Sequence, residues 1–152
     1  MKKLNNKIAT AFAICAMGLS AFAQNTAGKS EDMGRICIAA YVPQQIDKMP
    51  DADMGLEFLR KAPVPTVILS STANEVRYDA IAKQKMIWLQ KYGITFNPIF
   101  VPGKRLKQQH AAPDRILIDD TESVIDQWNA AGGIGILHKD WETTITILKM
   151  YV

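Results

Sequence analysis

The stretch Arg115-Ile-Leu-Ile-Asp-Asp-Thr-Glu122 decides how the fold and function of this chain are interpreted. A short apolar, β-branched run is typical of a buried strand, and this run ends in two adjacent carboxylates, Asp119 and Asp120. Neighbouring like charges repel, and a bound divalent cation relieves the repulsion. Mg²⁺ prefers such oxygen ligands. The stretch therefore predicts a metal site, unless one aspartate only caps the helix that follows.

The rest of the chain alternates between apolar stretches of strand type and stretches of helical type. Strands are predicted at residues 36–42, 65–69, 98–101, 115–118 and 134–137, and helices at residues 51–61, 74–92, 121–131 and 141–149. This alternation predicts parallel strands joined by right-handed crossovers, which form a three-layer α/β sandwich. Functional groups in such folds gather at the carboxyl ends of strands.

Hydroxyl and lysine side chains follow two other predicted strands. Ser70 and Ser71 come after Val67-Ile-Leu69, and hydroxyls at a strand end can hold a phosphate oxygen. The alternative is ordinary turn chemistry, which also favours serine. Lys104 follows the next strand, at a position where a cation could offset phosphate charge. Lys107 or Lys85 could take that role instead, and any single lysine can simply be solvated.

The first 23 residues have the pattern of an export signal. Three lysines precede an apolar run, and Ala21-Phe-Ala23 fits a cleavage site for small residues. We therefore expect a signal peptide at residues 1–23, a linker at residues 24–33 and one α/β domain at residues 34–152. The mature protein would be periplasmic or secreted, and the run is too short for a stable membrane anchor.

Composition excludes several other classes of function. Removing residues 1–23 takes away three lysines and no acidic residue from a formal net charge of +3, so the mature chain is nearly neutral and nucleic-acid binding is not expected. Cys15 would leave with the leader and Cys37 would be single, which excludes a disulfide within the mature chain. A zinc site lacks ligands, since His110 and His138 are the only histidines. Both are expected to be structural or solvated, and the three tryptophans are expected in the core.

Taken in order, the segments resemble the haloacid dehalogenase-like phosphohydrolases, particularly the 5′(3′)-deoxyribonucleotidase-like branch. The matching passages cover about residues 49–149. They read Met49-Pro-Asp-Ala52, Val67-Ile-Leu-Ser-Ser71, Lys85-Met-Ile-Trp-Leu89, Ile116-Leu-Ile-Asp-Asp120 and Gln127-Trp-Asn-Ala-Ala-Gly-Gly-Ile-Gly-Ile-Leu-His138.

The resemblance implies a magnesium-dependent phosphatase that acts on a phosphorylated small molecule such as a nucleotide. Ser70 would bind the phosphate, with Ser71 beside it. Lys104 would be the lysine on the phosphate side, and Asp119 and Asp120 would hold Mg²⁺.

One departure from this family is severe. Its first strand ends in Asp-x-Asp, where the first aspartate attacks phosphorus and the second is the general acid and base. The predicted strand at residues 36–42 has no carboxylate, and Asp51-Ala-Asp53 lies at a helix start. The sheet is therefore expected to be incomplete at its first strand and any activity impaired. A catalytically silent phosphate- or magnesium-binding relative and a truncated fragment are the alternatives.

Overall fold

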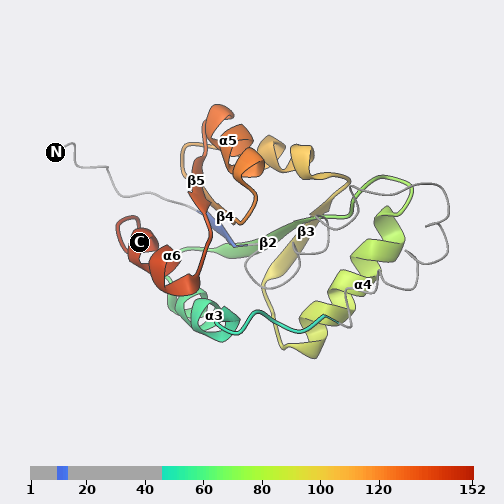
Figure 1. The fold of residues 1–152 in the computed structure, drawn as a ribbon, viewed down its shortest axis with the longest axis horizontal. Helices are drawn as coiled ribbons and strands as arrows, with labels where there is room; N and C mark the ends of the chain where they lie inside the picture. The colour runs from blue at the N-terminus through green and yellow to red at the C-terminus, as the bar shows by residue number, and fades with distance from the viewer. Residues whose placement is uncertain (1–9, 14–45) are drawn as a thin grey trace.

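The computed structural model describes residues 10–13 and 46–152 of the chain (Figure 1). Residues 10–13 are described by their backbone. The described part forms a mixed α/β fold, in which parallel strands alternate with helices as the sequence predicts.

The centre of the fold is a five-stranded parallel sheet in the order β3-β2-β1-β4-β5. The strands are β1 (Thr10–Ala13), β2 (Thr66–Ser71), β3 (Asn97–Val101), β4 (Arg115–Asp119) and β5 (Ile134–Leu137). Because all the strands are parallel, their carboxyl ends lie along the same edge of the sheet. That edge is where polar groups can meet.

Helices cover both faces of this sheet (Figure 1). One side carries α3 (Ala52–Lys61), α4 (Tyr78–Lys91) and α6 (Trp141–Leu148), and the other carries the 3₁₀ helix η3 (Lys104–His110) and α5 (Glu122–Ala130). The chain moves outward from β1 to β3 and then crosses to β4 and β5. The usual right-handed connection places the linking helices of the two halves on opposite faces of the sheet.

Hydrophobic burial holds the layers together. Trp88, Trp128 and Trp141 are each fully buried, which confirms their expected place in the core. Ile116, Leu117 and Ile118 of β4 are also fully buried, because helices cover both faces of the strand. Each buried aliphatic side chain of this size contributes about 1.5–3 kcal/mol relative to an exposed one.

Glycine ends two of the helices. After α4, Gly93 adopts a φ of 61° and its N–H donates to the carbonyl of Gln90. After α5, Gly132 adopts a φ of 90°, and the next residue, Gly133, donates to the carbonyl of Trp128. These left-handed backbone positions are easily adopted only without a Cβ atom, so the chain can leave each helix and enter the next strand.

Most predicted elements agree with the structure to within a few residues, and two differ. The helix predicted from residue 74 begins at Tyr78, because Asn74 instead accepts a hydrogen bond from the Arg77 N–H in a turn. No element is predicted between residues 101 and 115, where the structure has η3. The predicted strand at residues 36–42 and linker at residues 24–33 lie outside the described residues.

The expectation of an incomplete sheet is wrong for this structure. β1 lies between β2 and β4, with Phe12 paired to Val67 on one side and to Leu117 on the other. The central strand is thus supplied by residues that the sequence analysis assigns to the export signal. The signal peptide at residues 1–23, its cleavage and the domain boundary at residue 34 remain predictions.

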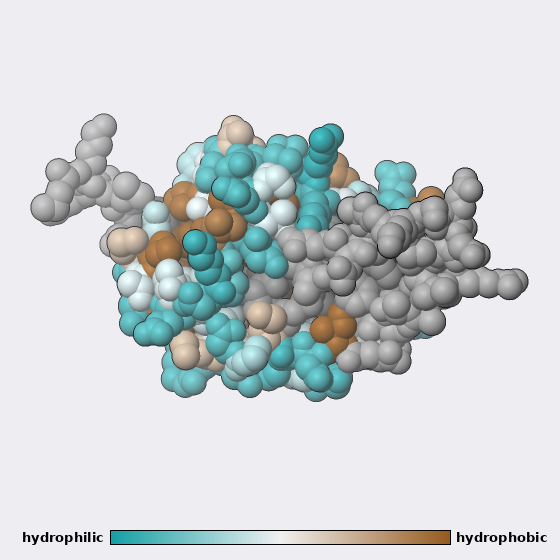
Figure 2. Space-filling view, in the orientation of Figure 1, coloured by the Kyte–Doolittle hydropathy of each residue, from teal (hydrophilic) through white to brown (hydrophobic). Residues whose placement is uncertain are grey.

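On the face shown in Figure 2, hydrophilic residues predominate among the described residues, and apolar residues form small groups. Among the described residues, no helix combines the length and apolar character needed to cross a membrane.

Candidate phosphate-binding site

Two of the predicted site residues lie on the strands that flank β1. Ser70 belongs to β2 and Asp119 to β4. Since Val67, Phe12 and Leu117 are aligned across the three strands, Ser70 lies at the level of Asp120, one residue beyond Asp119. Two strand spacings amount to about 10 Å. The structure thus brings the serine and the acid pair to the same edge, on either side of one strand.

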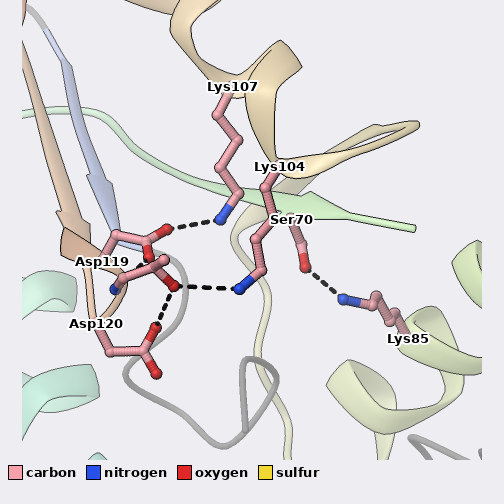
Figure 3. Close-up of polar contacts among 7 residues, drawn as sticks. Ser70, Lys85, Lys104, Lys107, Asp119 and Asp120 are labelled. Carbon is pink, nitrogen blue, oxygen red and sulfur yellow. Dashed lines mark hydrogen bonds and ion pairs between the residues drawn. The ribbon is translucent and has the colours of Figure 1, made fainter. Parts of the chain in front are cut away.

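A buried ion pair anchors the acidic side of the site. The Nζ atom of Lys107 lies 2.6 Å from Oδ2 of Asp119, and the two side chains are 2% and 0% exposed (Figure 3). The burial of two charges is costly unless they are paired and hydrogen-bonded. The Asp119 carboxylate satisfies this condition further, because its Oδ1 accepts a hydrogen bond from the Thr121 N–H at 2.9 Å.

Asp120 and Lys104 are connected through one hydroxyl group. Lys104 Nζ donates to Thr121 Oγ1 at 3.3 Å, and that hydroxyl donates to Asp120 Oδ1 at 3.2 Å. These three residues are partly exposed, whereas Asp119 and Lys107 are buried. The site therefore has a buried layer and a layer that solvent reaches.

On the other side of β1, Ser70 is held by a lysine of α4. Lys85 Nζ donates to Ser70 Oγ at 2.7 Å, and the residues are 5% and 1% exposed. Ser71 ends β2 and is partly exposed. Figure 3 shows that Lys85 approaches Ser70 from the side opposite to Lys104, Lys107 and the two aspartates.

Two lysines of η3 lie at the acid pair. Lys107 makes the ion pair with Asp119, while Lys104 contacts Thr121, and the role of Lys104 on the phosphate side remains a prediction. Both point to this edge because residues three apart lie on the same side of a 3₁₀ helix. The spacing of Lys104 and Lys107 is informative only once the 3₁₀ helix is known.

Lys85, which the sequence offers as an alternative to Lys104, contacts Ser70. Its position in α4, one turn before the buried Trp88 and Leu89, places it on the face that packs against the sheet. A lysine at a core position of a helix is a usable sequence signal, since lysine is rarely buried without a partner.

The two histidines have structural contacts. His138 Nδ1 lies 2.8 Å from Thr144 Oγ1, and the His110 carbonyl accepts a hydrogen bond from Arg115. Burial lowers the pKa of His138, although Asp51, Asp120 and Asp140 act in the opposite direction. Burial, with a smaller effect of Arg115, also lowers the pKa of His110.

Asp51 and Asp53 lie at the start of α3, as predicted. Asp51 Oδ2 accepts a hydrogen bond from the Trp141 N–H at 2.8 Å and so connects α3 to α6. Asp53 forms an ion pair with Lys48, and its side chain is 76% exposed. Their contacts are those of structural helix-start charges.

The acid pair can supply part of a magnesium site. Within residues 46–152 and β1, no three His, Cys, Asp or Glu side chains are grouped so that they could hold a metal ion. Mg²⁺ is commonly held by one or two carboxylates, with water and substrate phosphate as the other ligands. The partly exposed Asp120 could supply one such ligand, whereas Asp119 is buried and its two oxygens already contact Lys107 and Thr121.

A carboxylate nucleophile is absent from β1, because its sequence is Thr10-Ala-Phe-Ala13. The first acidic residue of the chain is Glu31. The strand between Ser70 and Asp119 therefore cannot carry the Asp-x-Asp motif at its end.

Comparison with known proteins bears on the fold. No protein-family model and no curated protein matches the chain. The structure is similar to the crystal structure, at 1.44 Å resolution, of an uncharacterized protein from Corynebacterium glutamicum ATCC 13032 Kitasato. The TM-score is 0.51 and the sequence identity 18%, over 95% of this chain and 96% of that chain. This likeness supports an α/β fold over nearly the whole length of both proteins.

Proposed function

We propose that this protein is a haloacid dehalogenase-like relative that binds the phosphate group of a small phosphorylated molecule, such as a nucleotide, with Mg²⁺ at the carboxyl edge of its sheet. Hydrolysis of the phosphomonoester is the activity that the family resemblance implies. We expect it to be weak, because a covalent nucleophile normally accounts for orders of magnitude in rate.

The observation that carries the proposal is the convergence of two buried lysine contacts at one edge. Lys107 pairs with Asp119 on β4, and Lys85 contacts Ser70 on β2. A metal-bound phosphate is held by hydroxyl and ammonium groups, and its metal ion by carboxylates.

Mg²⁺ would be held at Asp120 and Asp119, where it would neutralise charge on the phosphate. Thr121 fixes both carboxylates, since its N–H donates to Asp119 and its hydroxyl to Asp120. Lys104 reaches the same hydroxyl and adds positive charge at the exposed rim. Together these contacts orient the acid pair before a ligand arrives.

Titration calorimetry of the full chain with MgCl₂ and inorganic phosphate tests this function. We expect phosphate binding that strengthens with Mg²⁺, and loss of the Mg²⁺ effect in Asp120→Asn. Asp126→Asn, an exposed change in α5, is the matched control and should bind as the unaltered protein does. Absence of phosphate binding in the unaltered protein would refute the proposal.

Turnover is measured separately with para-nitrophenyl phosphate and a deoxynucleoside monophosphate. Binding with little hydrolysis supports the silent relative. Efficient hydrolysis that Asp53→Asn abolishes would support a catalytic role for Asp53, despite its exposed pairing with Lys48.

A further inference from the structure

We propose that Lys85 positions the Ser70 hydroxyl as a hydrogen-bond donor to the bound phosphate, and that the two residues form the anion-binding half of the site. This inference rests on the proposed function, and assigns to Lys85 a role different from those of Lys104 and Lys107.

The direction of the Lys85–Ser70 hydrogen bond is fixed by chemistry. An ammonium group has three donors and no acceptor, so the Ser70 oxygen must accept the bond, at 2.7 Å. A hydroxyl that accepts in one direction keeps its own proton for another. Lys85 approaches from the α4 side, so the Ser70 proton is available in a different direction from the ammonium group.

The positive charge of Lys85 also makes Ser70 a better donor to an anion. A cation that withdraws electron density from the oxygen strengthens the bond that the hydroxyl donates. Both residues are nearly completely buried, so this effect operates where water screens little. An anion next to Ser70 would thus gain both a hydrogen bond and attraction to a nearby ammonium group.

The three lysines of this edge have different tasks in consequence. Lys107 is paired to a carboxylate and reduces the repulsion between Asp119 and a phosphate. Lys104 is at the rim and contacts Thr121. Lys85 donates a hydrogen bond to the Ser70 hydroxyl and so places an ammonium group beside it.

The test measures the affinity of the full chain for inorganic phosphate, by titration calorimetry with Mg²⁺ present. Lys85→Met keeps the aliphatic stem and removes the charge, so we expect affinity to fall by about tenfold or more, the effect of one charge-assisted hydrogen bond. Ser70→Ala should have a similar effect. The double variant should lose little more than either single one, since the residues act as a unit.

Lys83→Met is the matched control, because Lys83 is an exposed lysine of the same helix. Its phosphate affinity should stay within about twofold of the unaltered protein. Thermal unfolding of each variant separates binding from stability. If Lys85→Met and Ser70→Ala lower the melting temperature but bind phosphate unchanged, the contact is structural and the inference is wrong.

A second pair of variants covers the case in which Lys85→Met does not fold. Lys85→Arg retains the charge and should bind phosphate within a few fold, whereas Lys85→Gln retains only polarity and should bind about tenfold more weakly. Equal affinities of these two would overturn the inference. If the unaltered protein binds phosphate and the Lys85 variants bind it with the same affinity, the proposed function stands and Lys85 does not have this role. If the unaltered protein fails to bind phosphate, both fall.

Discussion

The Nζ atom of Lys107 lies 2.6 Å from Oδ2 of Asp119, and this pair joins η3 to the end of β4 beneath the surface of the protein. The contact explains how a carboxylate with 0% exposure is tolerated in the sheet. It also makes the two residues interdependent, because either charge left alone in the interior would be costly.

Replacing Lys107 by methionine should therefore destabilise the protein strongly. The change keeps the volume of the stem but leaves Asp119 buried without its cation, which costs about 3–5 kcal/mol in comparable buried pairs. Urea unfolding followed by circular dichroism measures the loss.

Lys104→Met serves as the control, since Lys104 is partly exposed and contacts only a hydroxyl in the described structure. It should change the free energy of unfolding by less than about 1 kcal/mol. Adding Asp119→Asn to Lys107→Met should recover part of the loss, because a neutral amide is cheaper to bury than an unpaired carboxylate. No recovery would contradict the ion-pair explanation.

The packing of α3 against α6 depends on Gly55. A Cβ atom at this position would lie 2.1 Å from the ring of Trp141, which is fully buried. Gly55→Ala should thus destabilise the protein by about 1–3 kcal/mol, the usual cost of overpacking. This outcome opposes helix propensity, which favours alanine by about 1 kcal/mol.

Met54→Ala is an exposed change in the same helix, and we expect an effect within about 0.5 kcal/mol. Differential scanning calorimetry of both variants gives the comparison. A Gly55→Ala protein that is more stable than the unaltered one would show that α3 and α6 are not packed in this way.

Stability should decrease as the pH falls below about 6.5, the ordinary pKa of histidine. Burial lowers the pKa of both His110 and His138 in the folded protein. The unfolded chain therefore binds more protons in this window, and protonation favours unfolding until the pH passes below the folded-state pKa values.

Unfolding in urea between pH 7.5 and 5.5 tests this dependence, and His110→Gln and His138→Gln should each reduce its slope. Protonation of Asp140 lowers the stability only at lower pH, because hydrogen bonds from Thr143 hold the pKa of Asp140 below the ordinary value of 3.8. A stability that does not change with pH in the histidine window would rule out buried neutral histidines.

Removal of residues 1–23 should abolish cooperative unfolding and phosphate binding together. β1 supplies the backbone partners of both β2 and β4, and those strands carry Ser70 and Asp119. Without it the two halves of the site lose their common support. Calorimetry of a chain that begins at Gln24 gives the result.

The same experiment bears on export. A chain starting at Gln24 that unfolds cooperatively and binds phosphate would mean that another segment takes the place of β1, and residues 36–42 are the candidate that the sequence predicts. Determining the amino-terminal residue of the protein recovered from the periplasm or medium shows whether cleavage after Ala23 occurs.

The sequence predicted the strands and helices after residue 46 well, because their signals are local. The apolar run that leads to Asp119 is short and β-branched, and the glycines after α4 and α5 mark helix ends. It also placed Ser70 and the acid pair at carboxyl ends of strands. It did not predict η3, whose seven residues have no clear apolar period.

By itself, then, the sequence determined the α/β alternation and the chemical character of the strand ends, since both depend on residues close together in the chain. Only the tertiary structure decided that Thr10–Ala13 separates Ser70 from Asp119, and that Lys85 and Lys107 are the lysines that contact them. The physical reason is that these contacts join residues from different strands and helices. Their choice depends on strand order and on the burial of charge, which no local pattern of residues specifies.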